Sequence, residues 1–336
     1  MTLARRALGR VALDVSVLGF GAAPLGDLYA RLDEATSVAT VEAAIGMGVT
    51  LIDTSPLYGH GMSELRVGAA LRRAGTAGIA ISTKIGRVMD PFASGDGSGY
   101  VGGLRHAARF DYSYDGAMRS LEQSMLRIGV DRIDIALIHD VDVWTHGKDA
   151  IDRRFGEAME GAYKALDALR RAGTVRAIGV GVNEADMCLR FARAGDIDAV
   201  LLAGRYSLLE QPAAAEFLPV AIRKRIGVML GGVFNSGILA TGPVAGAKYN
   251  YKPAPPEILA KVASIEAICK RHGVRLYEAA LQFALAHPAV SSVVLGAVKP
   301  SEVAEQREAL TRPLPAALWQ ELKAAGLLAS EAPVPG

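Results

Sequence analysis

The sequence predicts a (β/α)8 barrel, also called a TIM barrel, and three observations point to it. Eight short β-branched or apolar segments alternate with longer segments whose apolar residues recur at helical spacing. The short segments are apolar on both faces, as in a parallel sheet that helices cover. The length of 336 residues suits one such barrel with insertions. Because no linker or composition break divides the chain, we expect a single barrel domain over residues 1–336; a doubly wound sheet is the alternative.

The barrel strands are expected where β-branched and apolar residues cluster between turn residues. A small hairpin is expected just before the first of them. The expected strands, in chain order, are residues 16–21, 50–55, 79–86, 133–140, 175–183, 199–204, 227–232 and 291–297.

The expected helices lie between these strands. Apolar residues recur at helical spacing, as at Leu121, Met125 and Ile128, and several segments end in Gly, which favours helix termination. A further helix is expected near the C-terminus, within residues 314–330. Two Gly-rich stretches, 87–112 and 233–255, are predicted to be long loops, which often carry function. The helical segments are residues 36–48, 63–73, 113–129, 155–173, 184–195, 213–225 and 255–273, and another helix begins after Pro300.

Composition excludes several classes of function. The net charge is +2 with acidic and basic residues interspersed, which argues against a nucleic-acid partner. No apolar run approaches the roughly 18–20 residues of a membrane span, and the N-terminal residues lack the apolar core of a signal peptide. Cys188 and Cys269 lie far apart in helical segments, so we expect no disulfide and a cytoplasmic location.

Polar side chains at the C-terminal ends of the strands are candidates for catalysis, because active sites of such barrels lie there. Asp53 ends the second strand, and Tyr58 follows on the next loop. Lys84 lies near the end of the third strand, and His139, followed by Asp140, ends the fourth. A lysine in an apolar strand needs a partner, and Asp53 on the adjacent strand is the expected counter-ion.

This set of residues suits proton transfer at an oxygen, coupled to hydride transfer. We expect the Lys84 ammonium to lower the pKa of the Tyr58 phenol, so that Tyr58 gives or takes a proton. His139 is expected to bond the same substrate oxygen and orient it. The chain shows neither a Ser–His–Asp nucleophile nor metal-ligand spacing such as HxxxH or CxxC, so we expect no metal.

The segment DTSPLYGHGMSELRVG (53–68) resembles the signature of the aldo-keto reductases, with Lys84 and His139 at the positions of the other two catalytic residues. The resemblance covers nearly the whole chain. It implies a (β/α)8 barrel that binds an extended nicotinamide cofactor without a Rossmann domain. It also implies that Tyr58 is the proton donor or acceptor, that Lys84 and Asp53 tune it, and that His139 orients the substrate.

The same resemblance implies where the cofactor lies. The stretch GFGAAPLG (19–26) is only a weak match to a dinucleotide fingerprint, because Pro24 replaces its last Gly. Cofactor contacts are instead expected at the ends of strands, in Gly-rich turns, and at the start of the helix after Pro300. The candidate cofactor residues are Gly21, Ala22, Asp53, Asn183, Tyr206, Gly231, Gly232, Val233, Phe234, Asn235, Ser236, Gly296, Ala297, Glu302 and Gln306.

Two departures from the family pattern bear on the cofactor. Gly296 and Glu302 stand where NADP-preferring members commonly carry Lys and Arg. A carboxylate repels a 2′-phosphate and accepts a bond from a free 2′-hydroxyl, so we expect NAD rather than NADP, although Lys299 lies close by. Gly231 stands where many members carry an aromatic that stacks on nicotinamide, and Phe234 or Tyr206 is a candidate substitute.

Three segments, residues 110–140, 204–211 and 231–242, resemble the bacterial branch of the family that contains L-fucose (D-threo-aldose) 1-dehydrogenases and pyridoxal 4-dehydrogenases. The implied reaction oxidises a cyclic hemiacetal to a lactone, with Tyr58 accepting the proton. Tyr58, His139 and Trp144 are the candidate substrate contacts. The alternatives are a broad aldehyde or ketone reductase and a non-catalytic redox-sensing barrel, against which the intact set of four catalytic residues speaks. A small molecule is the only partner expected.

Overall fold

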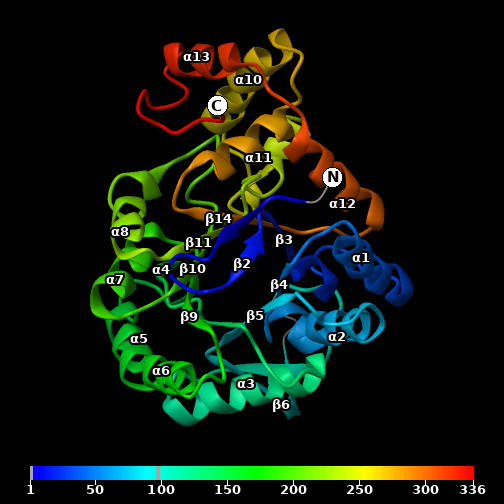
Figure 1. Ribbon diagram of the computed structural model, residues 1–336, viewed down its shortest axis with the longest axis vertical. Coiled ribbons are helices and arrows are strands. Elements are labelled where there is room, and N and C mark those ends of the chain that lie inside the picture. The colour runs from blue at the N-terminus through cyan, green and yellow to red at the C-terminus, as the bar shows by residue number, and fades with distance from the viewer. Residues whose placement is uncertain (1–2, 96–98) are drawn as a thin grey trace.

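Eight parallel strands close into a barrel in this computed structural model, which describes residues 3–95 and 99–336 (Figure 1). The strands neighbour one another in chain order around the barrel, and the last, β14, pairs with the first, β3. Seven of them fall within the predicted segments, and β14 begins one residue before its segment, at Val290, so the predicted fold class is confirmed. The barrel strands are β3 (Leu18–Gly21), β4 (Leu51–Asp53), β5 (Ala80–Ile85), β8 (Ile135–His139), β9 (Ala177–Val182), β10 (Ala199–Ala203), β11 (Gly227–Gly231) and β14 (Val290–Leu295).

Helices form the outer ring, and most of them present an apolar face to the barrel and a polar face outward (Figure 1). All of the predicted helical segments contain helix. The segment 155–173 is a run of α5, a π-helical turn at Ala158–Ala162 and α6. The helices are α1 (Glu34–Gly46), α2 (Met62–Ala74), α3 (Tyr114–Ile128), α4 (Val143–His146), α5 (Ile151–Glu157), α6 (Tyr163–Arg171), α7 (Ala185–Ala194), α8 (Phe217–Lys224), α9 (Ile238–Thr241), α10 (Pro256–Arg271), α11 (Leu276–Ala286), α12 (Pro300–Thr311) and α13 (Ala316–Ala324).

Helix α11 was not predicted, because it lacks a polar face. Leu276, Leu281 and Phe283 are buried, and so are most of its alanines. Without alternating polar positions, its sequence carries no amphipathic signal. The predicted C-terminal helix is present as α13, which packs on α10 (Figure 1).

The two stretches predicted to be loops contain secondary structure. Residues 87–112 hold an antiparallel hairpin of β6 (Arg87–Ser94) and β7 (His106–Phe110), which packs on α3, while residues 96–98 lie outside the described residues. Residues 233–255 contain α9 and the short strands β12 (Lys248–Tyr249) and β13 (Lys252–Pro253). Both stretches follow C-terminal strand ends, where they cover the barrel.

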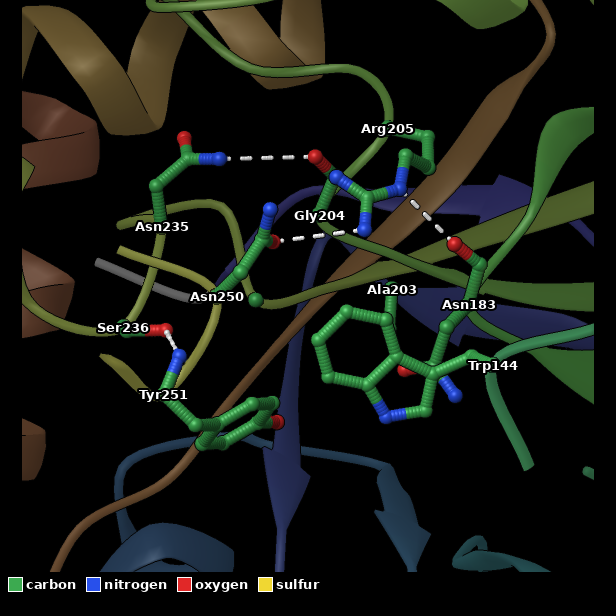
Figure 2. A pocket seen from close by; sticks show the side chains of 10 residues that line it. Trp144, Asn183, Ala203, Gly204, Arg205, Asn235, Ser236, Asn250 and Tyr251 are labelled. Atoms are coloured by element: carbon green, nitrogen blue, oxygen red, sulfur yellow. Dashed lines mark hydrogen bonds between the residues drawn. The ribbon is translucent and has the colours of Figure 1, made fainter. Parts of the chain in front are cut away.

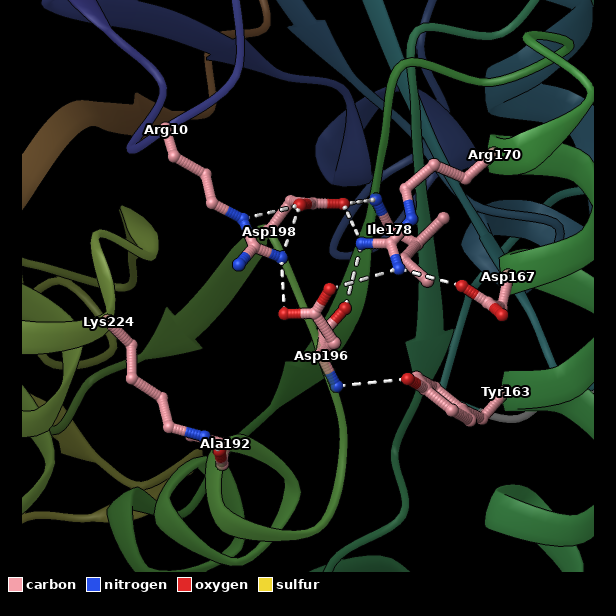
Figure 3. Close-up of polar contacts among 9 residues, drawn as sticks. All are labelled: Arg10, Tyr163, Asp167, Arg170, Ile178, Ala192, Asp196, Asp198 and Lys224. Atoms are coloured by element: carbon pink, nitrogen blue, oxygen red, sulfur yellow. Dashed lines mark hydrogen bonds and ion pairs between the residues drawn. The ribbon is translucent and has the colours of Figure 1, made fainter.

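The predicted N-terminal hairpin closes the opposite end of the barrel. Strands β1 (Arg5–Ala7) and β2 (Asp14–Ser16) pair antiparallel, and Leu8, Leu13 and Val15 pack against the barrel interior. Asp198, at the start of β10, ties the hairpin to the barrel: one oxygen accepts from Arg10, and the other accepts from Arg170 and from the backbone of β9 (Figure 3). This end therefore serves stability, and the other end is left for the site.

Candidate active site

The four predicted catalytic side chains meet at the C-terminal end of the barrel. Asp53, Lys84 and His139 lie at or next to the last residues of β4, β5 and β8, which are neighbours in the barrel. Tyr58 begins the 3-10 turn that follows β4. Asp53, Lys84 and His139 are buried, so their interactions take place in a low-dielectric environment.

Asp53 and Lys84 form the predicted ion pair. The Lys84 ammonium lies 2.9 and 2.8 Å from the two Asp53 oxygens and donates a third bond, of 2.8 Å, to the Thr54 carbonyl. Ser82 donates to the same carboxylate at 2.7 Å. These contacts account for all three protons of the ammonium.

The predicted direction of the Tyr58 pKa was wrong. Lys84 Nζ lies 5.1 Å from the centroid of the Tyr58 ring. Burial, and then the Asp53 carboxylate, raise the pKa of Tyr58 well above its ordinary value. The prediction counted the ammonium alone, whereas Asp53 cancels most of that charge and burial disfavours the phenolate. The phenol is therefore protonated at neutral pH.

His139 is held so that it presents an N–H group. Ser55 Oγ lies 3.2 Å, and Arg87 Nη1 3.3 Å, from His139 Nδ1. Because a guanidinium has no acceptor, Nδ1 is the unprotonated nitrogen and the ring proton lies on Nε2. Burial, and then the charges of Arg87 and Lys84, hold the pKa of His139 well below its usual value. The neutral ring meets the Tyr58 ring edge to face, with centroids 6.0 Å apart.

The remaining residues of the segment 53–68 hold Tyr58 in place. Gly26 and Gly59 bring two backbones together, since a Cβ on Gly26 would lie 2.5 Å from the Tyr58 carbonyl carbon. Glu64 is fully buried; it accepts from Thr83 Oγ1 at 2.8 Å and from Arg127 Nε at 2.6 Å. These contacts fix the loop of Tyr58 against its neighbours.

A hollow lies over the ends of β9, β10 and β11 (Figure 2). The side chains of Ser236 and Tyr251 face those of Trp144 and Asn183 across it. Five lining residues were predicted: Trp144, Asn183, Gly232, Asn235 and Ser236. The sequence analysis missed the other five, which are Ala203, Gly204, Arg205, Asn250 and Tyr251.

The polar groups of this hollow fit a nicotinamide cofactor. Asp142 holds the Asn183 side chain, whose Nδ2 donates to Asp142 Oδ2 at 3.0 Å, so the amide is oriented in advance. Asn235 Oδ1 is buried without a hydrogen-bond partner among the described residues. Arg205 lies on the wall, where its guanidinium pairs with Glu210 at 3.2 Å and donates to the Asn183 carbonyl at 2.8 Å. An amide, an acceptor that lacks a donor and a guanidinium suit a ligand that carries a carboxamide and phosphates.

The aromatic residues predicted to stack on the nicotinamide do not line the hollow. Tyr206 is 1% exposed and stacks on Phe283 of α11, with centroids 5.4 Å apart, so this prediction was wrong. Its ring points outward from the barrel, a direction that its position after β10 does not specify. Phe234 also packs on the core, and Val233 is fully buried. At Gly231 a Cβ would make only ordinary van der Waals contacts with Leu201 and Ala203, so no clash excludes a side chain there.

The other predicted cofactor residues lie together where β3 meets β14. The ends of the two strands bring Gly21 beside Gly296, and a Cβ on Gly296 would lie 2.6 Å from Pro24 Cγ. Ala22 and Ala297 are buried next to them. Two side chains of α12 form hydrogen bonds with the turn after β14. Glu302 accepts from the Val298 N–H at 2.9 Å, and Gln306 donates to the Gly296 carbonyl at 2.8 Å.

Arg87 and Asp140 are site residues to which the sequence analysis gave no role. Arg87 Nη1 lies 2.8 Å from Asp140 Oδ2, and both side chains adjoin His139. Each stands within two residues of the end of a barrel strand. Asp140 was already noted after His139 but without a role, and extending the search two residues beyond β5 would have found Arg87.

Comparison with known proteins gives a consistent result. The sequence profile of the Aldo/keto reductase family matches residues 17–326. A pyridoxal 4-dehydrogenase of Microbacterium luteolum is 38% identical over 335 residues, covering 96% of this chain and 98% of that protein. A D-threo-aldose 1-dehydrogenase of Pseudomonas sp is 36% identical over 337 residues, covering 98% and 99%. An aldo-keto reductase of Bacillus halodurans in its holo form has a TM-score of 0.75 at 23% identity, with 96% of each chain covered, and supports the fold alone.

Proposed function

This chain belongs to the Aldo/keto reductase family and is an oxidoreductase that acts on CH–OH groups with a nicotinamide cofactor, and we propose that it oxidises the hemiacetal carbon of an aldose or of pyridoxal to a lactone. The names of the two relatives denote oxidation at one carbon of an aldose and of pyridoxal. Both compounds form cyclic hemiacetals, in which the reacting carbon carries one hydrogen and one hydroxyl. Removal of a hydride and a proton from that group gives a lactone.

The observation that carries the proposal is the convergence of Tyr58 and His139 beside the buried Lys84–Asp53 pair. The hydroxyl of the hemiacetal binds between the Tyr58 oxygen and the His139 Nε2–H, which donates to it. Tyr58 must first lose its own proton, and as a phenolate it then accepts the hydroxyl proton when the C–H bond breaks. Lys84, fixed by Asp53, stabilises the negative charge on the phenol oxygen during this transfer.

The bound cofactor supplies the hydride acceptor. Asn183, Arg205, Asn235 and Ser236 would hold it on one side of the barrel mouth, and Gly21, Gly296 and Glu302 on the other. The Glu302 carboxylate lies in the first turn of α12, where a 2′-phosphate would meet a negative charge. We therefore propose that the enzyme prefers NAD to NADP.

One observation favours a second candidate, a broad aldehyde and ketone reductase. The raised pKa of Tyr58 keeps the phenol protonated at neutral pH, which suits proton donation to a carbonyl oxygen. In the oxidative direction Tyr58 must first lose that proton.

A substrate panel separates the two candidates. NADH formation would be followed with L-fucose, L-galactose, D-arabinose and pyridoxal, and NADH consumption with simple aldehydes. The proposal expects NADH formation with at least one hemiacetal, together with recovery of the corresponding lactone. Oxidation of none of the four alongside rapid reduction of simple aldehydes would overturn it in favour of the reductase. Cofactor binding without any turnover would indicate a redox-sensing barrel.

A further inference from the structure

Arg87 and Asp140 form a buried ion pair at the barrel mouth that the mechanism above does not use. Arg87 Nη1 lies 2.8 Å from Asp140 Oδ2, and the two side chains are 8% and 12% exposed. The face of Phe110 lies 4.3 Å from the Arg87 guanidinium carbon and fixes its plane. The pair is thus rigidly held and almost dry.

Stability does not explain a pair in this position. Desolvation of two buried charges commonly offsets their attraction, so an apolar pair of similar volume would serve the fold as well. Asp140 also adopts a φ of 55°, which is uncommon for a residue with a side chain. Its N–H still donates to the Gly181 carbonyl, so the backbone stays paired while the chain turns. Such strain with buried charge is typical of functional sites.

The second oxygen of Asp140 faces the catalytic centre. Oδ1 lies 3.4 Å from His139 Nε2, the atom that carries the ring proton, and this distance is too long for a strong hydrogen bond. Oδ1 therefore retains capacity to accept a bond from a ligand. The Asp140 charge also contributes, after burial, to the raised pKa values of Tyr58, Tyr100 and Tyr251, so these phenols lie within electrostatic range of the same carboxylate.

The two candidate substrate classes share a feature that this pair matches. An aldose carries a hydroxyl on the carbon next to the reacting carbon. Pyridoxal carries a phenolic hydroxyl on the ring carbon two bonds from its reacting carbon. We propose that Arg87 and Asp140 form a subsite for this second substrate oxygen, an inference that rests on the proposed function. Asp140 Oδ1 accepts a hydrogen bond from the substrate hydroxyl, and Arg87 donates to the same oxygen.

The test compares two sugars that differ by this one oxygen, D-arabinose and 2-deoxy-D-ribose, which is D-arabinose without its 2-hydroxyl. We expect the wild type to favour D-arabinose in kcat/KM by on the order of 10- to 100-fold, the effect of one hydrogen bond to a charged group. In Asp140→Asn we expect kcat/KM for D-arabinose to fall by a similar factor while that for the deoxy sugar changes little. The ratio of the two values would then approach one.

The control is Asp90→Asn. Asp90 pairs with Arg109 at 2.8 Å in the hairpin β6–β7, which also contains Arg87. It should keep the wild-type ratio. Thermal unfolding and quenching of protein fluorescence by NADH would verify that each variant folds and binds cofactor. An equal loss for both sugars in Asp140→Asn, or no discrimination by the wild type, would overturn the subsite.

Pyridoxal and 3-deoxypyridoxal provide the same comparison if pyridoxal is the better substrate. Failure of the wild type to oxidise any aldose or pyridoxal would instead refute the proposed function, and the subsite with it. The two failures are distinguishable because only the second abolishes wild-type oxidation.

Discussion

At the residue scale, the proton chemistry of the site depends on where its charges are held. Lys84 is fixed by Asp53, and the charge of the pair largely cancels. Burial, and then the charges of Arg87 and Lys84, keep His139 neutral, and two donors on Nδ1 direct its proton to Nε2. The groups that meet a substrate are therefore a protonated phenol and a neutral N–H donor. Either one can form a hydrogen bond with an uncharged substrate oxygen without leaving a buried charge unpaired.

Glu302 allows a test of cofactor preference at this scale. We expect Glu302→Arg to shift the ratio of kcat/KM for NADP over NAD upward by on the order of tenfold, or about 1.4 kcal/mol, because a guanidinium pairs with the 2′-phosphate. Steady-state kinetics with both cofactors would measure this ratio.

The matched control is Glu305→Arg, which makes the same change on an exposed part of α12. It should leave the ratio near its wild-type value. If Glu302→Arg does not change the ratio either, the assignment of Glu302 to the ribose is wrong.

Single residues also show what the sequence could predict about the site. Asp53, Lys84 and His139 were predicted to meet because the C-terminal ends of neighbouring strands lie side by side. The direction of the Tyr58 pKa could not be predicted, because it depends on burial and on the net charge of a pair. Tyr206 follows a strand end but points outward into α11, and only the packing of that helix reveals this.

At the element scale, the helices around the site depend on close approaches. Gly68 lies in α2, and a Cβ there would overlap the Ile128 carbonyl at the end of α3. The two helices therefore pack backbone to backbone, and Glu64 of α2 bonds Arg127 of α3 one turn away. This contact supports the helix that follows the Tyr58 loop.

We expect Gly68→Ala to lower the free energy of unfolding by about 1–3 kcal/mol, because the added methyl forces α2 and α3 apart. Urea unfolding would measure the change. Gly156→Ala is the control, since Gly156 lies in α5 and a Cβ there would meet nothing within 4 Å. It should be neutral or slightly stabilising. Equal stability of the wild type and Gly68→Ala would show that the helices have room.

Helices and strands could be predicted where polar and apolar residues alternate along the sequence or where the sequence forms a short apolar run. The eight barrel strands and the amphipathic helices carry these patterns. Helix α11 is buried on most of its surface, and the hairpin β6–β7 reads as a Gly-rich loop, so neither has a local signal. Tertiary packing decides both.

At the scale of the whole molecule, three histidines link stability to pH. Burial holds the pKa values of His139, His146 and His287 below the ordinary value. These groups are neutral in the folded protein and take up protons on unfolding below about pH 6.5. Stability is therefore highest above that pH and falls as the pH drops through it. Burial raises the pKa of Asp140, which therefore increases stability as the pH falls, but it is a single group and the histidines are three.

We expect the Tm to be lower at pH 5.5 than at pH 7.5, with a single transition if residues 1–336 form the one domain that we propose. Carboxylates with lowered pKa values, such as Glu278, contribute only at still lower pH. Thermal unfolding followed by circular dichroism across this range would measure the effect. A Tm that is constant or that rises on acidification would contradict it.

Tyr58 provides the most direct test of the proposed mechanism, because the account assigns to its hydroxyl alone the transfer of the proton. In Tyr58→Phe the ring and its packing remain, so we expect NADH binding to be unchanged. Oxidation of the best hemiacetal substrate should slow by about 10²- to 10⁴-fold in kcat. If Tyr58→Phe binds NADH normally and oxidises that substrate at the wild-type rate, Tyr58 does not carry the proton and the mechanism is wrong.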